Sequence, residues 1–227
     1  MDLAMKESNQ RKRILVVDDH PLMREGIVQW IERTADLEVC CQAESREQAL
    51  LILEKDRPDL VLTDISLTGG SGLDLIKDIC VLFPGIPVLV LSMHEESLYA
   101  GRVLRAGARG YIMKRAGGER IVEAIHEVFR GGIALSRDMA THLLEEYSGR
   151  KARSNRTELP SLTDREFEIF QLIGEARTNR EIAQQLRLSP KTVETHRINV
   201  MRKMKVKTTA ELMRFALQYA EKGGTAP

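Results

Sequence analysis

Several features that would place this chain in a specialised class are missing from it. No apolar run approaches the ~20 residues that a helix needs to cross a bilayer, and the start "MDLAMKESNQRKR" lacks the apolar region of a secretory signal. Only three cysteines are present, two of them adjacent, which fits neither a disulfide framework nor a C-x-x-C metal site. We therefore expect a cytoplasmic protein with reduced cysteines and no membrane partner.

A strong excess of one charge is also missing, because the formal net charge of the 227 residues is +1. That total hides an asymmetry. Residues 1–147 contain 18 Lys and Arg against 24 Asp and Glu, a net charge of −6, whereas residues 148–227 contain 16 against 9, a net charge of +7. The basic part predicts a polyanionic partner, although two solvated surfaces that differ by chance would give the same count. The length favours two domains.

In the acidic part, short apolar runs alternate with amphipathic stretches, which is typical of βα units in a parallel sheet. Helix signals lie between the runs: Pro21 in a first turn, a capping box from Ser45 to Gln48, and Gly131 and Gly132 at the end of the last amphipathic stretch. The pattern predicts a doubly wound α/β domain over residues 11–131. Its five parallel strands are expected at residues 13–18, 38–43, 59–64, 86–92 and 110–114.

Charged and hydroxyl side chains stand where these strands end: Asp18, Asp19, Asp64, Ser92 and Lys114. Ligands of such sheets bind in the crevice beyond the carboxyl ends of the strands. Three carboxylates there would repel one another unless a cation intervened, and Mg²⁺ prefers oxygen ligands. Lys114 and Ser92 suit a phosphoryl group, and Asp64 precedes a glycine-rich loop that leaves it open to attack phosphorus. Any one of these residues could be a turn or capping residue, but the five together predict a phosphoryl site.

The segments "VVDDH", "LTDISLTGGSGLDLI", "VLVLSMH" and "GYIMKR" resemble the receiver domains of two-component response regulators, over the whole first domain. The resemblance implies a flavodoxin-like fold and phosphoryl transfer from a sensor histidine kinase to Asp64. It also implies Mg²⁺ bound by Asp19, Asp64 and the backbone carbonyl of Ser66, with Asp18 acting through the shell of the ion.

By the same resemblance, Lys114 would contact the phosphoryl oxygens, Ser92 would move toward them, and Tyr111 would rotate inward. A half-exposed strand aromatic is the alternative for Tyr111. Two departures concern loop geometry, since Thr68 and Arg115 stand where the family commonly has proline. Met93, beside Ser92, is bulky enough to narrow access to the site.

Residues 134–147 predict a short helix, and the polar segment "SGRKARSNRTELP" that follows predicts a linker. Its four basic residues either bind DNA phosphates or keep the linker solvated.

Residues 161–227 contain four helix starts with recognisable caps. Capping boxes begin at Thr163, Thr178 and Thr208, and Ser189 is an N-cap followed by Pro190. Helical spacing predicts the core of a small all-α domain: Phe167, Phe170, Ile173, Ile182, Ala183, Leu186, Val193, Val200, Met204, Leu212, Phe215 and Ala216.

A helix pair alone is a weak signal of DNA binding. The sequence from "LTDREFEIF" to "MRFALQYA", however, resembles almost end to end the LuxR-type helix-turn-helix of the NarL/FixJ subfamily. The resemblance makes residues 190–204 the recognition helix and the last helix a dimerisation surface. Residues implied to face bases are Lys191, Glu194, Thr195 and Asn199, and those implied to hold phosphates are Thr192, His196, Arg197 and Lys203. Glu194 would repel phosphates unless it accepts from a cytosine amine or pairs with a cation, and each of these side chains could instead be simply solvated.

The expected protein is a DNA-binding transcription regulator, not an enzyme, with a receiver at residues 11–131, a linker at 132–160 and a DNA-binding domain at 161–227. Phosphorylation of Asp64 would favour a homodimer on promoter DNA, where RNA polymerase is a possible further partner. One alternative is a constitutive regulator with an unphosphorylated receiver. Another is an aspartyl-phosphate phosphatase, which the absence of an inserted cap segment and the basic second domain disfavour.

Overall fold

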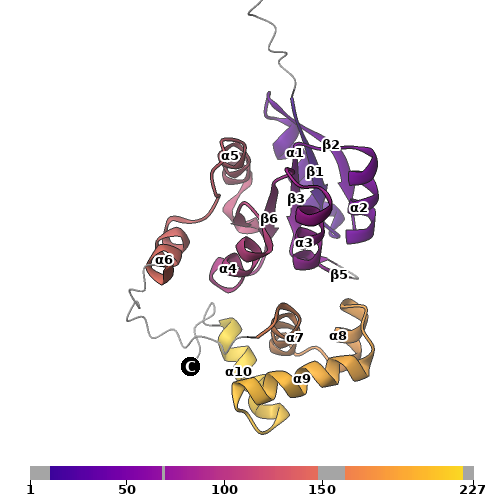
Figure 1. Ribbon diagram of the computed structural model, residues 1–227, viewed down its shortest axis with the longest axis vertical. Coiled ribbons are helices and arrows are strands. Elements are labelled where there is room, and N and C mark those ends of the chain that lie inside the picture. Colours follow the sequence, from indigo (N-terminus) through magenta and orange to yellow (C-terminus); the bar gives the residue numbers. More distant parts are fainter. Residues whose placement is uncertain (1–10, 68–69, 148–161, 222–227) are drawn as a thin grey trace, which may run out of the picture.

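The structure, a computed structural model, describes residues 11–67, 70–147 and 162–221. Figure 1 shows a larger α/β body above a smaller helical one. Five parallel strands form the main sheet in the order β2-β1-β3-β6-β7. They are β1 (Lys12–Val17), β2 (Leu37–Ala43), β3 (Leu60–Asp64), β6 (Val88–Ser92) and β7 (Tyr111–Met113). The five predicted strands are confirmed, with ends that differ by one or two residues.

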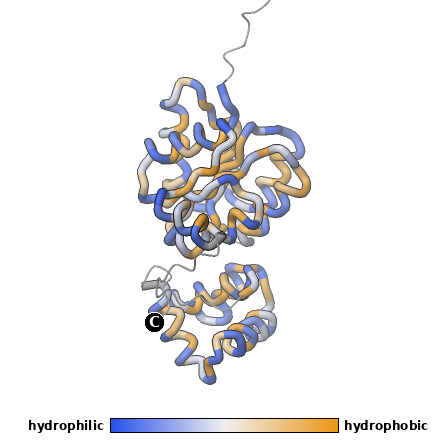
Figure 2. The backbone as a smooth tube through the Cα atoms, turned by 60° about the vertical axis from the view of Figure 1, so that its left-hand side comes forward, coloured by the Kyte–Doolittle hydropathy of each residue, from blue (hydrophilic) through white to orange (hydrophobic). Residues whose placement is uncertain are grey.

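Five helices cover the two faces of the sheet. They are α1 (Pro21–Glu32), α2 (Arg46–Lys55), α3 (Gly72–Leu82), α4 (Glu96–Ala106) and α5 (Gly118–Phe129). Side chains alternate along the strands, so Ile14 packs with Ile31 and Ile125 of α1 and α5, while Leu15 packs with Leu53 of α2. Figure 2 shows the resulting apolar strands inside the larger body and hydrophilic turns around it.

The helix ends largely follow the predicted signals. The Ser45 hydroxyl accepts from the backbone amide of Gln48, as a capping box requires. The Gln48 side chain, however, accepts from the backbone amide of Glu44 and not from that of Ser45, so the second bond of the box is displaced by one residue. Gly131 adopts a φ of 83°, which suits a glycine just past a helix. The 3-10 turn η1 (Lys114–Ala116) and α6 (Arg137–Tyr147) also belong to this body. The short helix predicted at residues 134–147 is thus present, while residues 148–160 of the predicted linker lie outside the described residues.

The smaller body consists of α7 (Asp164–Gly174), α8 (Asn179–Gln185), α9 (Pro190–Met204) and α10 (Thr209–Glu221). Both hydrogen bonds of the capping box form at Thr163, Thr178 and Thr208, and Ser189 caps α9. Ten of the twelve predicted core residues are buried; Met204 and Phe215 pack against the core while partly exposed. Among the described residues, no helix is long and apolar enough to cross a membrane.

The two bodies meet where α7 packs against α3 and α4. Asp164 at the start of α7 binds Lys77 at 2.6 Å and Arg102 at 3.0 Å. Burial alone would raise the pKa of Asp164, but these two cations outweigh it and lower that pKa. The contact places the first helix of the smaller body beside the carboxyl ends of the strands.

Candidate functional site

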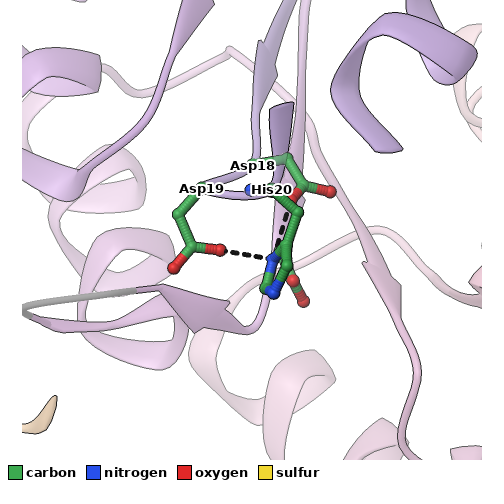
Figure 3. A group of neighbouring side chains, drawn as sticks. Asp18, Asp19 and His20 are labelled. Atoms are coloured by element: carbon green, nitrogen blue, oxygen red, sulfur yellow. Dashed lines mark hydrogen bonds and ion pairs between the residues drawn. The ribbon is translucent and has the colours of Figure 1, made fainter. Parts of the chain in front are cut away.

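An acidic cluster occupies the carboxyl ends of β1 and β3. Asp18 and Asp64 are buried, and ligand atoms of Asp18, Asp19, His20 and Asp64 all lie within 4.8 Å of one another. Figure 3 shows the Asp19 carboxylate pointing at the His20 ring, 2.7 Å from its Nδ1. His20 is a member that the sequence interpretation passed over, although it directly follows the two predicted aspartates.

Lys114 places its ammonium group between two of these carboxylates. Its Nζ lies 2.6 Å from Asp18 Oδ2 and 2.7 Å from Asp64 Oδ2, and all three side chains are at most 5% exposed. Burial raises the pKa of Asp64 above its ordinary value despite the nearby ammonium. The pKa of Lys114 is raised as well, since the carboxylates outweigh the effect of burial. One ammonium among three carboxylates leaves the cluster acidic.

The donor set suits a hard divalent cation. The predicted side-chain ligands Asp18, Asp19 and Asp64 all offer carboxylate oxygens, which Mg²⁺ prefers. The Ser66 amide donates to Asp64 Oδ1 at 3.2 Å, which fixes one oxygen of that carboxylate and leaves the other toward Lys114. Ligation by the Ser66 carbonyl stays a prediction.

The two predicted switch residues converge on His94. Ser92 Oγ, at the buried end of β6, accepts from the His94 amide at 3.2 Å, and the Tyr111 hydroxyl donates to the His94 carbonyl at 2.8 Å. Tyr111 is fully buried, which excludes the half-exposed alternative. Its ring therefore already occupies the inward position that we expected it to reach by rotation, and burial raises the pKa of its phenol. The His94 ring lies 2.9 Å from Ser66 Oγ, and burial lowers the pKa of this imidazole.

The loop after Asp64 is tied back to the strand. β4 (Ser66–Leu67) and β5 (Gly70–Ser71) form a short antiparallel ribbon that sequence reasoning did not predict. A Cβ on Gly72 would lie 2.5 Å from the Ile65 Cα, so only glycine fits this close approach. Thr68 lies outside the described residues.

The other two residues noted for access and loop geometry are both exposed. Arg115 pairs with Glu95 at 2.8 Å on the surface, and Met93 is 65% exposed. Met93 nevertheless lines the cavity at the site, and its narrowing of access stays a prediction.

A cavity of about 480 Å³ opens over the acidic cluster, and both domains line it. Asp64, His94 and Lys114 line it from the larger body, and Glu168 and Gln171 of α7 line it from the smaller one. Glu168 accepts from Ser71, and burial raises the pKa of its carboxyl group. The sequence pattern cannot predict that Glu168 and Gln171 line this cavity. Periodicity identifies which face of a helix is buried, but it does not identify the domain against which that face packs.

The predicted recognition helix α9 is not covered by the larger body in the arrangement described. Of the four residues expected to face bases, Lys191, Glu194 and Thr195 are exposed, and Asn199 is half-buried. Glu194 accepts from the side-chain amide of Asn179 at 2.6 Å. This partner is neutral, whereas a cytosine amine and a neighbouring cation were the two partners considered from the sequence.

The predicted phosphate contacts are less free. The backbone amide of Thr192 donates to the Ser189 hydroxyl, which caps α9, and His196 is half-buried. Arg197 donates to Asn179 at 2.7 Å, and Lys203 pairs with Glu166 at 2.6 Å. Contacts of these four residues with DNA stay predictions, and Lys203 would have to share its charge with Glu166.

Comparison with known proteins covers both bodies. Residues 14–126 match the family described as "Response regulator receiver domain", and residues 160–216 match "Bacterial regulatory proteins, luxR family". The oxygen regulatory protein NreC of Staphylococcus carnosus is 35% identical over 210 residues, which cover 91% of this chain and 97% of NreC. The transcriptional regulatory protein DegU of Brevibacillus brevis is 33% identical over 215 residues, 88% of this chain and 91% of DegU.

A solved structure agrees in fold. RcsB from Salmonella enterica serovar Typhimurium, bound to promoter P1flhDC in the presence of phosphomimetic BeF3-, superposes with a TM-score of 0.67. It is 24% identical, and the match covers 92% of this chain and all of that one.

Proposed function

This chain belongs to the NarL/FixJ subfamily of response regulators, and from that membership we propose that phosphorylation of Asp64 controls its binding to promoter DNA. The observation that carries the proposal is the Asp64 carboxylate, buried between Lys114 and the acidic cluster yet bordering a cavity. The donor would be a sensor histidine kinase, which would meet this protein and its promoter in the cytoplasm.

Asp64 acts as the nucleophile in this proposal. One of its carboxylate oxygens forms a bond to phosphorus as the bond from phosphorus to the imidazole nitrogen of the donor breaks, and the phosphoryl group moves to Asp64. Asp18, Asp19, Asp64 and Ser66 would hold Mg²⁺, which supplies positive charge for the phosphoryl oxygens. Lys114 adds a second positive charge at the same oxygens, since its ammonium already lies against Asp64.

Control of DNA binding works through dimerisation in this proposal. The larger body docks on α7, whereas Lys191 and Thr195 of the recognition helix stay exposed. Docking therefore does not block DNA by covering the reading face. Release of the DNA-binding domain would instead let two copies occupy paired half-sites, and linked modules bind far more tightly than single ones.

The test compares Asp64→Ala with wild type in a gel shift on DNA selected from a random pool, with and without acetyl phosphate and Mg²⁺. Asp138→Asn, an exposed carboxylate on α6, is the control. We expect phosphodonor to tighten binding by wild type and Asp138→Asn, and to leave Asp64→Ala weak. Equal binding by Asp64→Ala and phosphorylated wild type would refute the coupling and favour a constitutive regulator.

A further inference from the structure

We propose that Tyr99 on α4 transmits the state of the phosphoacceptor site to the DNA-binding domain through ring contacts that run from His94 to Phe167. This inference rests on the proposed function and specifies how the same site is coupled to DNA binding. The contacts lie in the interface between α4 and α7, and the sequence motifs of the receiver give no sign of them.

The row of rings His94, Tyr99 and Phe167 begins at His94, whose main chain is held by both switch residues. Ser92 and Tyr111 are bonded to it on both sides, at 3.2 Å and 2.8 Å. The His94 ring also bonds Ser66, whose amide donates to Asp64. A change in the bonding of either switch residue therefore changes the forces that position His94.

Tyr99 forms the middle of the row. Its ring centroid lies 5.0 Å from that of His94 on one side and 5.1 Å from that of Phe167 on the other. The contact with Phe167 is edge-on, with an interplanar angle of 74°, a favoured geometry for aromatic pairs. Tyr99 is only 4% exposed, so the ring cannot move without disturbing one of these neighbours.

Phe167 connects the row to the DNA-binding domain. It is 1% exposed and belongs to the core that α7 shares with the other helices of that domain. The Arg102 guanidinium lies 4.2 Å from the Phe167 ring centroid and also binds Asp164. Tyr99 and Arg102, one turn apart on α4, thus hold the first turn of α7 together.

These contacts define a two-state element of the kind that coupling between sites requires. While Asp64 is unmodified, His94 is held by Ser92 and Tyr111, and Tyr99 packs against Phe167. When the Ser92 hydroxyl turns toward a phosphoryl group, the bond from the His94 amide to that hydroxyl is lost, and His94 loses its support on that side. Tyr99 then follows His94, and the grip on α7 loosens.

Replacement of the ring tests this route in the full-length chain. Tyr99→Leu removes both ring contacts but keeps an apolar side chain, and Tyr99→Phe keeps the ring as the matched control. Without phosphodonor, we expect Tyr99→Leu to bind the selected DNA at least about fivefold more tightly than wild type, within the range of allosteric coupling. Phosphodonor should then raise the DNA affinity of Tyr99→Leu by less than about twofold, although Asp64 of this variant is still phosphorylated.

Ile31→Ala controls for general loss of receiver stability. Ile31 is buried on α1 and packs with Ile14 and Ile125, in a part of the core that does not include Tyr99. It should leave the response to phosphodonor unchanged, as should Tyr99→Phe. A wild-type response in Tyr99→Leu, or the same release by Ile31→Ala, would overturn the Tyr99 route and leave the proposed function intact. A wild-type protein that is phosphorylated without any gain in DNA binding would overturn both.

Discussion

At the scale of single residues, the balance of charge around Lys114 decides the stability of the acidic cluster. The Lys114 side chain is 3% exposed, and its ammonium contacts two buried carboxylates, those of Asp18 and Asp64. Removing one partner of a buried ion pair leaves the other charge uncompensated, which is more costly than losing a surface pair. The same carboxylate oxygens would bind Mg²⁺ in the proposed function. The Lys114 ammonium and the ion would therefore both offset the negative charge of the same carboxylates.

We predict that Lys114→Ala lowers the free energy of unfolding by about 3 kcal/mol at neutral pH in EDTA. Added Mg²⁺ should restore more stability to this variant than to wild type, because the ion compensates carboxylates that have lost their ammonium. Urea unfolding with and without Mg²⁺ measures both effects. Arg115→Ala, the exposed neighbour paired with Glu95, should change stability by less than about 1 kcal/mol. Equal Mg²⁺ dependence in wild type and Lys114→Ala would contradict this account.

The sequence predicted the charged residues of the site better than their surroundings. Asp18, Asp64 and Lys114 end strands, and the rule that strand ends share one crevice brings them together. His94 gives no such signal, because its role depends on the main-chain bonds that Ser92 and Tyr111 make to it. Side-chain type and spacing cannot reveal a bond to a backbone carbonyl.

At the scale of elements, helix capping accounts for where the short helices of the DNA-binding domain begin. α8 (Asn179–Gln185) has only seven residues, and isolated helices of that length are not stable in water. Thr178 and Glu181 close a full capping box at its start, and Ile182 and Ala183 pack into the core. Capping and burial together therefore hold α8, the helix that packs against α9.

We predict that Thr178→Ala lowers the free energy of unfolding of the DNA-binding domain by about 1 kcal/mol, the usual cost of a lost N-cap. DNA affinity should fall with it, because α8 packs against α9. Thr209→Ala, an exposed position one residue past the Thr208 cap, is the control and should change stability by less than about 0.5 kcal/mol. Thermal unfolding and gel shifts report the two effects. A loss no larger than that of Thr209→Ala would mean that packing alone defines the start of α8.

Elements with strong local signals were the ones that sequence could predict. The five strands contain short apolar runs, and most helix caps follow fixed spacings, so both appear close to where they were expected. The ribbon of β4 and β5 is too short for periodicity to show and depends on the close approach at Gly72. The packing of α7 on α4 depends on shape and charge across two domains, which no local pattern contains.

At the scale of the whole molecule, two kinds of contact hold the domains together. The pair of Lys77 with Asp164 and that of Arg187 with Glu47 lie at the surface, with side chains 33–56% exposed. The rings of Tyr99 and Phe167 are buried. Salt screens exposed ion pairs and leaves buried apolar contacts in place, so docking has one component that depends on salt and one that does not.

We predict that raising the ionic strength partly opens the unphosphorylated protein, which small-angle X-ray scattering detects as a larger radius of gyration. A double variant with Lys77→Gln and Arg187→Gln should be as open at low salt as wild type is at high salt, and should respond little to further salt. Arg11→Gln, whose pair with Glu32 is equally exposed but lies within the receiver, is the control. A radius that does not change with salt in wild type would show that the buried contacts alone hold the domains.

The central claim is that phosphorylation of Asp64 produces a dimer that binds DNA. The most direct test is the mass of the full-length protein by light scattering, with and without acetyl phosphate and Mg²⁺, in parallel with a gel shift on the same samples. We predict that phosphodonor doubles the mass and tightens DNA binding together, and that Asp64→Ala shows neither change. Strong DNA binding that is indifferent to phosphodonor, at constant mass, would contradict it and leave the receiver as a scaffold.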